Sequence, residues 1–364
     1  MAADDVVLSA YQLEAVVRAI VAQGGSSDYE ANLVAVNLVE ANLTGHDSHG
    51  VGMIPRYVDA ALEGGLAVNQ HPTVVLDTGP LLSVEGNHGY GQVIGQEAMG
   101  LAIDRAKRHG VCVLALANSH HIGRIGFWAE QAVAAGLVSV HFVNVFARPI
   151  VAPWGGGDAR FGTNPFCVGI PHPGREPIIL DFATSRIAQG KTRVAYNKGE
   201  ALAPGVVIDD AGRPTTDPRF TVVAPFGALL PFGEHKGSGL ALVCEILGAA
   251  LTGGRSYHER VSGHRWQVLN SMLAVLVDPE HLGAAAHLAA ETEAIVAWAT
   301  GSPPGEGFDK VRVAGEPERE IKQRRLAEGI PVDAVTWADI VKAGEKLGLA
   351  RERVERIAAL DPAG

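Results

Sequence analysis

The stretch VCVLALANSHHIGRIG, residues 111–126, carries the clearest fold signal in the chain. Its first six residues, Val111 to Leu116, form an uninterrupted apolar run that is typical of a strand buried on both faces. A polar segment follows from Asn118 to Gly123, and residues 125–135 then return to a helical pattern. A buried strand that leads through polar residues into a helix indicates a sheet covered by helices.

The same alternation of strand and helix continues on both sides of this stretch. It predicts strands at 74–76, 81–84, 137–143, 166–170, 178–181 and 272–277, and helices at 92–109 and 240–251. The polar residues 253–265 and 300–325 are expected to form loops. We therefore expect a mixed α/β sheet domain over residues 73–330.

Both ends of the chain have a helical pattern that the middle lacks. Residues 9–42 predict two helices, the first with Ser9 as its N-cap. Residues 337–358 predict two shorter helices separated at Gly348. We expect residues 1–72 and 331–364 to pack together as a helical subdomain.

Composition and charge exclude several classes of partner and location. The 364-residue chain has a formal net charge of −10 and no basic stripe, which disfavours binding to nucleic acid or to an anionic membrane. Three cysteines lie in separate apolar runs without a CxxC motif, as expected for buried thiols. The first residues are acidic, unlike a signal peptide, and the longest apolar run is too short to cross a membrane. A cytoplasmic protein is expected.

Two clusters of polar residues have the composition of a catalytic site. Residues 45–50 place His46, Asp47, Ser48 and His49 together, and a hydroxyl beside an imidazole suits proton transfer. The simpler alternative is a polar turn in which an Asp or Ser caps the backbone. The second cluster, residues 118–126, follows the buried strand, where ligands of α/β proteins collect. The alternative there is a helix cap with a surface arginine.

Other segments carry weaker signals. Gly162-Thr163-Asn164-Pro165 and Asp181 to Ser185 are turn-forming segments beside predicted strands, and Lys236 precedes a helix in a position that suits phosphate binding. Gly315-Glu316 is expected in a loop. There is no GxGxxG, Walker A, HExxH or GxSxG motif and no zinc-type Cys/His spacing. His46 and His49 could share a metal with His120 or His121, but these motifs include no further carboxylate, and no metal is expected.

Taken in order, these motifs resemble the type-2 malate/L-lactate dehydrogenase family over nearly the whole chain. The matching segments are residues 45–50, 55–57, 118–123, 162–165, 180–184 and 234–237. The resemblance implies a fold that binds NAD or NADP without a Rossmann domain, and a homodimer with the cofactor near the subunit interface. It also implies hydride transfer between nicotinamide and the carbon of a small 2-oxo or 2-hydroxy acid.

The resemblance assigns roles to individual residues. His49 matches the acid/base histidine, with Ser48 beside it, and His121 matches a second histidine that contacts the substrate; we rank His49 first. The residues that match cofactor contacts of the family are Gly123, Arg124, Ile125, Thr163, Leu180, Asp181, Phe182, Ala183, Thr184, His235, Lys236, Asn270, Gly315 and Glu316.

The chain departs from the family where the substrate carboxylate is bound. Many members carry an arginine four residues after the position of His49, and here that position is Met53. Arg56, Arg124 or Arg148 could replace it, and Asn118 is also expected near the substrate. Met53 makes the predicted pocket less polar, which favours a bulkier or aromatic 2-oxo acid. The family's Pro-Gly-Glu segment is Ala314-Gly315-Glu316 here.

Several functions remain open at this point. The leading one is a 2-oxo acid reductase that also works as a 2-hydroxy acid dehydrogenase. A cyclic ketimine reductase would use the same hydride geometry on a C=N bond. A histidine-based metal hydrolase and a non-catalytic homologue that only binds the ligand are the alternatives from other classes.

Overall fold

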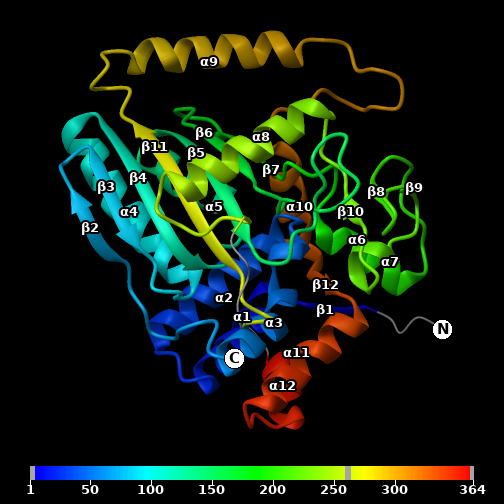
Figure 1. Cartoon of the computed structure of the whole chain (residues 1–364). Coiled ribbons are helices and arrows are strands. Elements are labelled where there is room, and N and C mark those ends of the chain that lie inside the picture. The colour runs from blue at the N-terminus through cyan, green and yellow to red at the C-terminus, as the bar shows by residue number, and fades with distance from the viewer. Residues whose placement is uncertain (1–4, 259–263, 361–364) are drawn as a thin grey trace.

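A seven-stranded mixed sheet forms the centre of the molecule (Figure 1). The computed structural model describes residues 5–258 and 264–360. The strand order is β2-β3-β4-β11-β5-β6-β7, and only β3 and β4 are parallel neighbours. This antiparallel-rich order differs from the parallel sheet of a Rossmann fold, so the predicted non-Rossmann α/β fold is confirmed. The strands are β2 (Thr73–Asp77), β3 (Leu81–Glu85), β4 (Val111–His120), β5 (Val138–Phe146), β6 (Phe166–Ile170), β7 (Ile178–Phe182) and β11 (Leu269–Val277).

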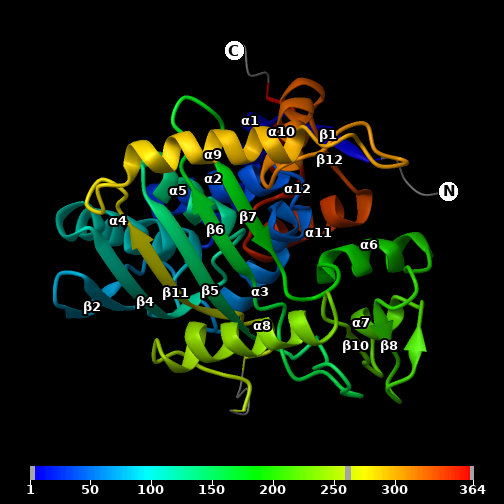
Figure 2. The same ribbon diagram turned by 90° about the horizontal axis from the view of Figure 1, so that it is seen from above.

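The two faces of this sheet are covered unequally. Helices α4 (Gly91–His109) and α5 (Gly126–Ala134) pack on one face, and Trp128 of α5 is fully buried there. Helix α8 (His235–Glu245) and the π-helical turn η3 (Ile246–Ala250) contact the other face at β5 and β11. Helix α9 (Ala285–Thr300) lies above the strands (Figures 1 and 2), and its Glu293 contacts His172 at 2.9 Å and Arg175 at 3.2 Å in the connection between β6 and β7. Part of the second face, in front of β3 and β4, is not covered by a helix (Figure 1).

Both ends of the chain build one helical subdomain, as predicted. A single apolar core contains Leu13, Ile20 and Leu38 from the N-terminal part, and Ile340 and Val354 from the C-terminal part. The two ends also pair as short antiparallel strands. The elements are β1 (Val6–Leu8), α1 (Ala10–Gln23), α2 (Asp28–Leu43), η1 (Asp47–His49), η2 (Val51–Met53), α3 (Ile54–Leu62), β12 (Ile330–Val332), α11 (Ala334–Lys346) and α12 (Arg351–Ala358).

A small lobe stands to one side of the sheet (Figure 2). It contains α6 (Gln189–Lys198), α7 (Arg219–Val222) and a three-stranded sheet of β8 (Val207–Ile208), β9 (Pro214–Thr215) and β10 (Ala228–Leu229). Strands of two residues leave no periodic pattern in the sequence, which is why they were not predicted. The lobe matters because α6 contacts the η1 turn that carries Ser48 and His49.

The expectation of a loop over residues 300–325 is correct for residues 301–315 and wrong from residue 316 onwards. Residues Glu316–Glu328 form helix α10, and Glu316 is its first residue rather than part of a loop. None of its residues is buried, so it has no apolar stripe to reveal it in the sequence. Ion pairs attach it to the helical subdomain instead, including Lys322 with Glu40 at 2.7 Å and Arg325 with Asp47 at 2.7 Å.

Two further findings concern cysteines and membrane spans. Cys112, Cys167 and Cys244 are all buried and free, which confirms the expected buried thiols. Within residues 5–258 and 264–360, no helix combines the length and the apolar character that a membrane span requires.

Candidate active site

Three strands bring the polar segments of the sequence to one edge of the sheet. The C-terminal end of β4, the N-terminal end of β11 and the C-terminal end of β5 coincide, because β11 runs antiparallel to both neighbours. Asn270 of β11 accepts a hydrogen bond from the amide of Ile122 at 2.9 Å and donates one to the carbonyl of Asn144 at 2.9 Å. Asn270, expected at the cofactor, thus holds the segment that begins at His121.

Two histidines from distant parts of the chain stack against each other at this edge. The rings of His49 and His121 lie 5.4 Å apart with an angle of 19° between them. Oγ of Ser48 lies 2.9 Å from Nδ1 of His49. The turn that carries them is fixed by Asn42, whose Oδ1 accepts from the amide of Val51 at 2.8 Å. The structure thus joins the first two polar clusters of the sequence.

Tyr57 is a site residue that the motifs did not single out. Its hydroxyl lies 2.6 Å from Nδ1 of His121 and accepts a hydrogen bond from Nε2 of Gln92 at 3.0 Å. Since the amide group of Gln92 donates to this oxygen, the phenolic proton points to Nδ1, and a neutral His121 carries its own proton on Nε2. The Pro55-Arg56-Tyr57 segment was visible in the sequence, but only the fold places the tyrosine against the histidine.

Burial keeps the histidines of this site neutral. It lowers the pKa of His49 to about 4, and repulsion from His46 and Arg124 acts in the same direction. The pKa of His121 falls well below its usual range because of burial and because His49, His120 and Arg56 repel a second positive charge. The neighbouring His120 is fully buried, and burial lowers its pKa to about 3. Proton exchange at the stacked pair therefore depends on ligands that change its charge environment.

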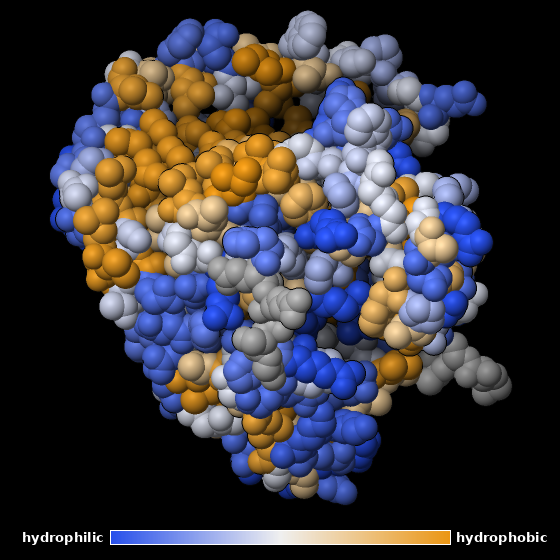
Figure 3. All heavy atoms as spheres, viewed as in Figure 1, coloured by the Kyte–Doolittle hydropathy of each residue, from blue (hydrophilic) through white to orange (hydrophobic). Residues whose placement is uncertain are grey.

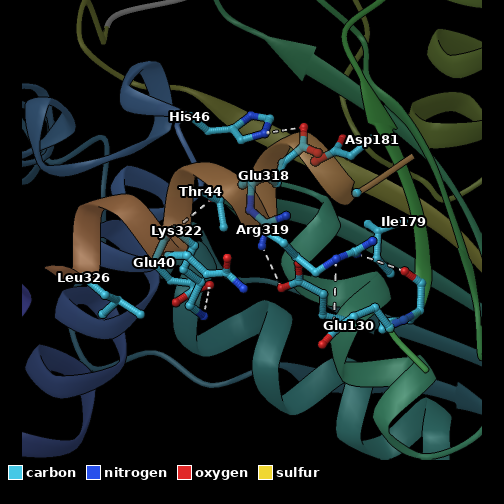
Figure 4. A pocket seen from close by; sticks show the side chains of 15 residues that line it. Glu40, Thr44, His46, Glu130, Ile179, Asp181, Glu318, Arg319, Lys322 and Leu326 are labelled. Atoms are coloured by element: carbon cyan, nitrogen blue, oxygen red, sulfur yellow. Dashed lines mark hydrogen bonds and ion pairs between the residues drawn. The ribbon is translucent and has the colours of Figure 1, made fainter. Parts of the chain in front are cut away.

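A polar cavity of about 360 Å³ opens beside His46 and Arg124 (Figure 4). Its walls come from α2, the start of β7 and helix α10, and most charged side chains in it are paired. Arg124 contacts Glu130 at 2.6 Å, and His46 contacts Glu318 at 3.5 Å. Asp181 accepts from the amide of Gly126 at 2.7 Å, and burial raises its pKa.

The cavity has the features that a dinucleotide needs. Nε of Arg124 and both polar side-chain atoms of Asn37 are buried without a hydrogen-bond partner. A Cβ atom on Gly123 would lie 2.5 Å from Oδ1 of Asn37, so only glycine allows the backbone to pass there. Gly315, with φ of +89°, is the N-cap of α10 and lines the same cavity. Gly123 precedes Arg124, so Gly123 and Asn37 adjoin the cavity without lining it, and the sequence motifs did not single out Asn37. NAD or NADP fits the residues present.

The predicted cofactor residues do not all lie at this cavity. Arg124, Asp181 and Gly315 line it, whereas His235 begins α8 and packs edge-on against Trp154, at 5.7 Å between ring centres. The other predicted residues have different surroundings. Lys236 is exposed on α8, and Leu180 and Ala183 lie partly exposed at the end of β7. Ile125 is buried in the sheet core, and Phe182 packs against Phe232. Glu316 accepts a hydrogen bond from the amide of Val313, and Thr184 donates one to the carbonyl of Thr163.

The predicted substrate residues separate into two groups. Arg124 is only 3% exposed and lies on the cofactor side with Glu130. Arg56 acts electrostatically on His121, Arg148 acts on Arg56, and each of these arginines donates to a backbone carbonyl. Met53 packs against the helical core, and Asn118 contacts Glu85 at 3.1 Å. Among the described residues, no three His, Cys, Asp or Glu side chains converge on a possible metal position.

The chain is similar to known proteins over nearly its whole length. A family model described as malate/L-lactate dehydrogenase matches residues 8–341. Hydroxycarboxylate dehydrogenase B of Escherichia coli (strain K12) is 47% identical over 348 residues, which cover 95% of this chain and 96% of that protein. A Δ1-pyrroline-2-carboxylate/Δ1-piperideine-2-carboxylate reductase of Pseudomonas syringae is 34% identical, over 93% of this chain and 95% of that protein. A solved Escherichia coli structure of the malate/lactate dehydrogenase type superposes with a TM-score of 0.92 at 45% identity, covering 97% and 98% of the two chains.

Proposed function

We propose, since this chain belongs to the malate/L-lactate dehydrogenase family, that it interconverts 2-oxo and 2-hydroxy carboxylates with NAD or NADP. The observation that carries the proposal is the stacked pair of His49 and His121 beside a polar cavity with unpartnered buried groups. An imidazole that can exchange a proton next to a dinucleotide site is the arrangement that carbonyl reduction requires.

The cofactor side of the site is formed by Arg124, Asn37, Gly123 and Gly315. The dinucleotide supplies or accepts the hydride. The backbone amides at the N-terminus of α10 and the buried Arg124 can bind a diphosphate, while Glu316 and Glu318 in the first turn of α10 and Glu130 beside Arg124 offset part of the positive charge. Gly123 allows close approach of the backbone. The choice between NAD and NADP is left to measurement.

His49 is the residue that we assign to proton transfer. Its Nδ1 faces the hydroxyl of Ser48, which can donate to a neutral ring or accept from a protonated one. His49 can therefore gain and lose a proton without losing this contact. His121 is held in one tautomer by Tyr57, so its Nε2–H suits a fixed hydrogen bond to the carbonyl oxygen of the substrate.

The test is the absorbance change at 340 nm with purified protein, NADH or NADPH, and a panel of 2-oxo acids with one cyclic imine. We expect oxidation of NADH or NADPH by at least one 2-oxo acid, unaffected by a chelator. His49→Ala should lower turnover strongly and leave the Kd of the dinucleotide nearly unchanged. Failure of both dinucleotides to bind would refute the proposal, and full activity of His49→Ala with an inactive His121→Ala would reverse the two roles.

A cyclic ketimine reductase is the second candidate, because a reductase with that kind of substrate is among the similar proteins. It would use the same hydride and the same histidines on a C=N bond. Oxidation of the cofactor by the imine alone, with no 2-oxo acid active, would favour this candidate.

We also propose that two copies associate through the open face of the sheet. Trp298 and Ile295 of α9 are 84% and 61% exposed, and Leu242 of α8, Ile246 of η3 and Leu251 after it are exposed as well. Figure 3 shows a broad hydrophobic area below α9. A hollow separates α9 from this surface in Figure 3. Exposed apolar area of this extent is typical of an interface, and the same surface offered by a second copy would cover it. Light scattering should give the mass of a dimer, and Trp298→Asp should reduce this mass towards that of the monomer.

The three free buried thiols support the expected cytoplasmic location.

A further inference from the structure

Three arginines lie close enough to act on one another electrostatically, and one of them, Arg56, also acts on His121. Arg56 lies beside Tyr57 on α3, and its Nε donates to the carbonyl of Trp266 at 3.0 Å. Arg148 follows β5, and its guanidinium lies 3.8 Å from the ring centre of Phe226. Arg193 comes from α6 in the small lobe and is exposed. No sequence motif pointed to Arg193.

The small lobe fixes the position of Arg193 against the catalytic turn. A Cβ atom on Gly52, next to Met53, would lie 3.6 Å from a terminal nitrogen of Arg193. On the same helix, a Cβ atom on Gly190 would lie 2.4 Å from Cβ of Ser48, so α6 sits directly on η1. The guanidinium of Arg193 therefore lies beside Gly52 in the η2 turn, which also contains position 53, where the family commonly has its arginine.

A chain of hydrogen bonds connects Arg193 to Arg148. Arg148 donates to the carbonyl of Thr221 at 3.1 Å, and the hydroxyl of Thr221 donates to the hydroxyl of Thr192 at 2.7 Å. Thr192 and Thr221 are both buried, so this bond is shielded from water. Because Thr192 precedes Arg193, these bonds anchor the backbone of α6 at Arg193 to the α7 segment that Arg148 contacts.

This set of positive charges has no counter-charge in the described protein. Within residues 5–258 and 264–360, no carboxylate forms an ion pair with Arg56, Arg148 or Arg193. Burial lowers the pKa of Arg56, and the charges of Arg148 and Arg193 lower it further. The hydroxyl of Tyr257 is also buried, and its charge environment includes Arg56 and Arg148. Like charges that are partly removed from water are costly unless an anion joins them.

We propose that Arg193, together with Arg56 and Arg148, binds the carboxylate of the substrate, and that Arg193 supplies the guanidinium that Met53 cannot. The inference rests on the proposed function and identifies the carboxylate-binding residues of that site. Guanidinium groups suit a carboxylate because they form paired, charge-assisted hydrogen bonds. Since Met53 packs against the helical core, the charge at this position is delivered by the small lobe.

The experiment compares Arg193→Met with Lys191→Met. Lys191 is an exposed cation on the same helix, so Lys191→Met removes one positive charge and introduces one methionine, as Arg193→Met does. Loss of one charge-assisted contact should raise the KM for the 2-oxo acid by roughly 10- to 100-fold. Arg193→Lys should recover part of the loss, and Lys191→Met should behave as wild type. The Kd of the dinucleotide, measured by its fluorescence, should not change in any of these variants.

A second measurement separates this inference from the proposed function. Oxamate carries the carboxylate but is not reduced, so its stabilisation of the protein against heat reports binding without turnover. We expect oxamate to stabilise wild type and Lys191→Met in the presence of the dinucleotide, and Arg193→Met much less. Equal stabilisation of Arg193→Met and wild type would overturn the role of Arg193. If oxamate binding requires Arg193 while no 2-oxo acid oxidises the cofactor, the carboxylate site stands and the proposed reaction fails.

Discussion

Replacement of Tyr57 by phenylalanine should affect both stability and turnover. The substitution removes only the hydroxyl that connects Nε2 of Gln92 and Nδ1 of His121, at 3.0 and 2.6 Å. Gln92 is 1% exposed and His121 is 9% exposed, so water cannot easily replace the lost partner. Two buried polar groups are left short of one hydrogen bond each.

The expected magnitude follows from these two groups. An unsatisfied buried donor or acceptor costs about 1–3 kcal/mol, so two such groups should cost the variant about 2–6 kcal/mol of unfolding free energy. For 364 residues the unfolding entropy is about 0.8 kcal/mol/K, so 3 kcal/mol lowers Tm by about 4 °C. A freed Nδ1 also lets the neutral ring of His121 move its proton away from Nε2. That change removes the donor to the substrate oxygen, and kcat should fall by roughly 10- to 100-fold.

The assay combines thermal unfolding with steady-state kinetics of 2-oxo acid reduction. Tyr11→Phe is the matched control, because it removes the same hydroxyl group from a tyrosine that is 50% exposed. The control should unfold and turn over as wild type does. A Tyr57→Phe variant with unchanged Tm and unchanged kcat would show that the hydroxyl does not set the tautomer of His121.

Three other expectations test separate parts of the structure. Burial lowers the pKa of His141 to about 4, below the usual 6.5, so the unfolded chain binds the proton at a higher pH than the folded protein does. The free energy of unfolding therefore decreases as the pH falls from 6.5 towards 4. Denaturant unfolding should show that wild type loses roughly 3 kcal/mol more than His141→Gln over this interval. Gly190→Ala should lower kcat by displacing Ser48, measured against Gly100→Ala, whose added Cβ meets nothing within 4 Å. Glu130→Gln should lower the unfolding free energy by roughly 1–3 kcal/mol, because it leaves the guanidinium of Arg124 buried beside Asp181 alone; an unchanged unfolding curve would contradict this.

The sequence predicted the elements with a strong periodic signal. The apolar run at 111–116 became β4, and the amphipathic segment at 92–109 became α4 at 91–109. Helix α10 was missed because it has no apolar stripe. Ion pairs such as Lys322 with Glu40, rather than apolar contacts, attach it to the helical subdomain. The place of β11 between β4 and β5 could not be predicted, since pairing across 150 residues leaves no local pattern.

The same limit applies to the site. The hydroxyl next to a histidine at Ser48-His49 is a local feature, and the sequence displays it. Tyr57 and Arg193 act across the fold, and their residue types are ordinary for helices, so only the packing of α3 and α6 around η1 identifies them. Asn37 also could not be identified from the sequence, because only the fold shows that its side-chain amide is buried without a partner and lies against Gly123.

The histidine pair lies between two sets of positive charge, and this has a consequence for proton transfer. His46 and Arg124 lower the pKa of His49 from the cofactor side, and Arg56 lowers that of His121 from the other side. Reduction of a carbonyl needs a protonated imidazole, which these charges oppose in the free protein. The proposed ligands are both anions, and each would offset the repulsion on its own side. The pair should therefore take up its proton only when both ligands are bound, which links protonation to the assembly of the complete site.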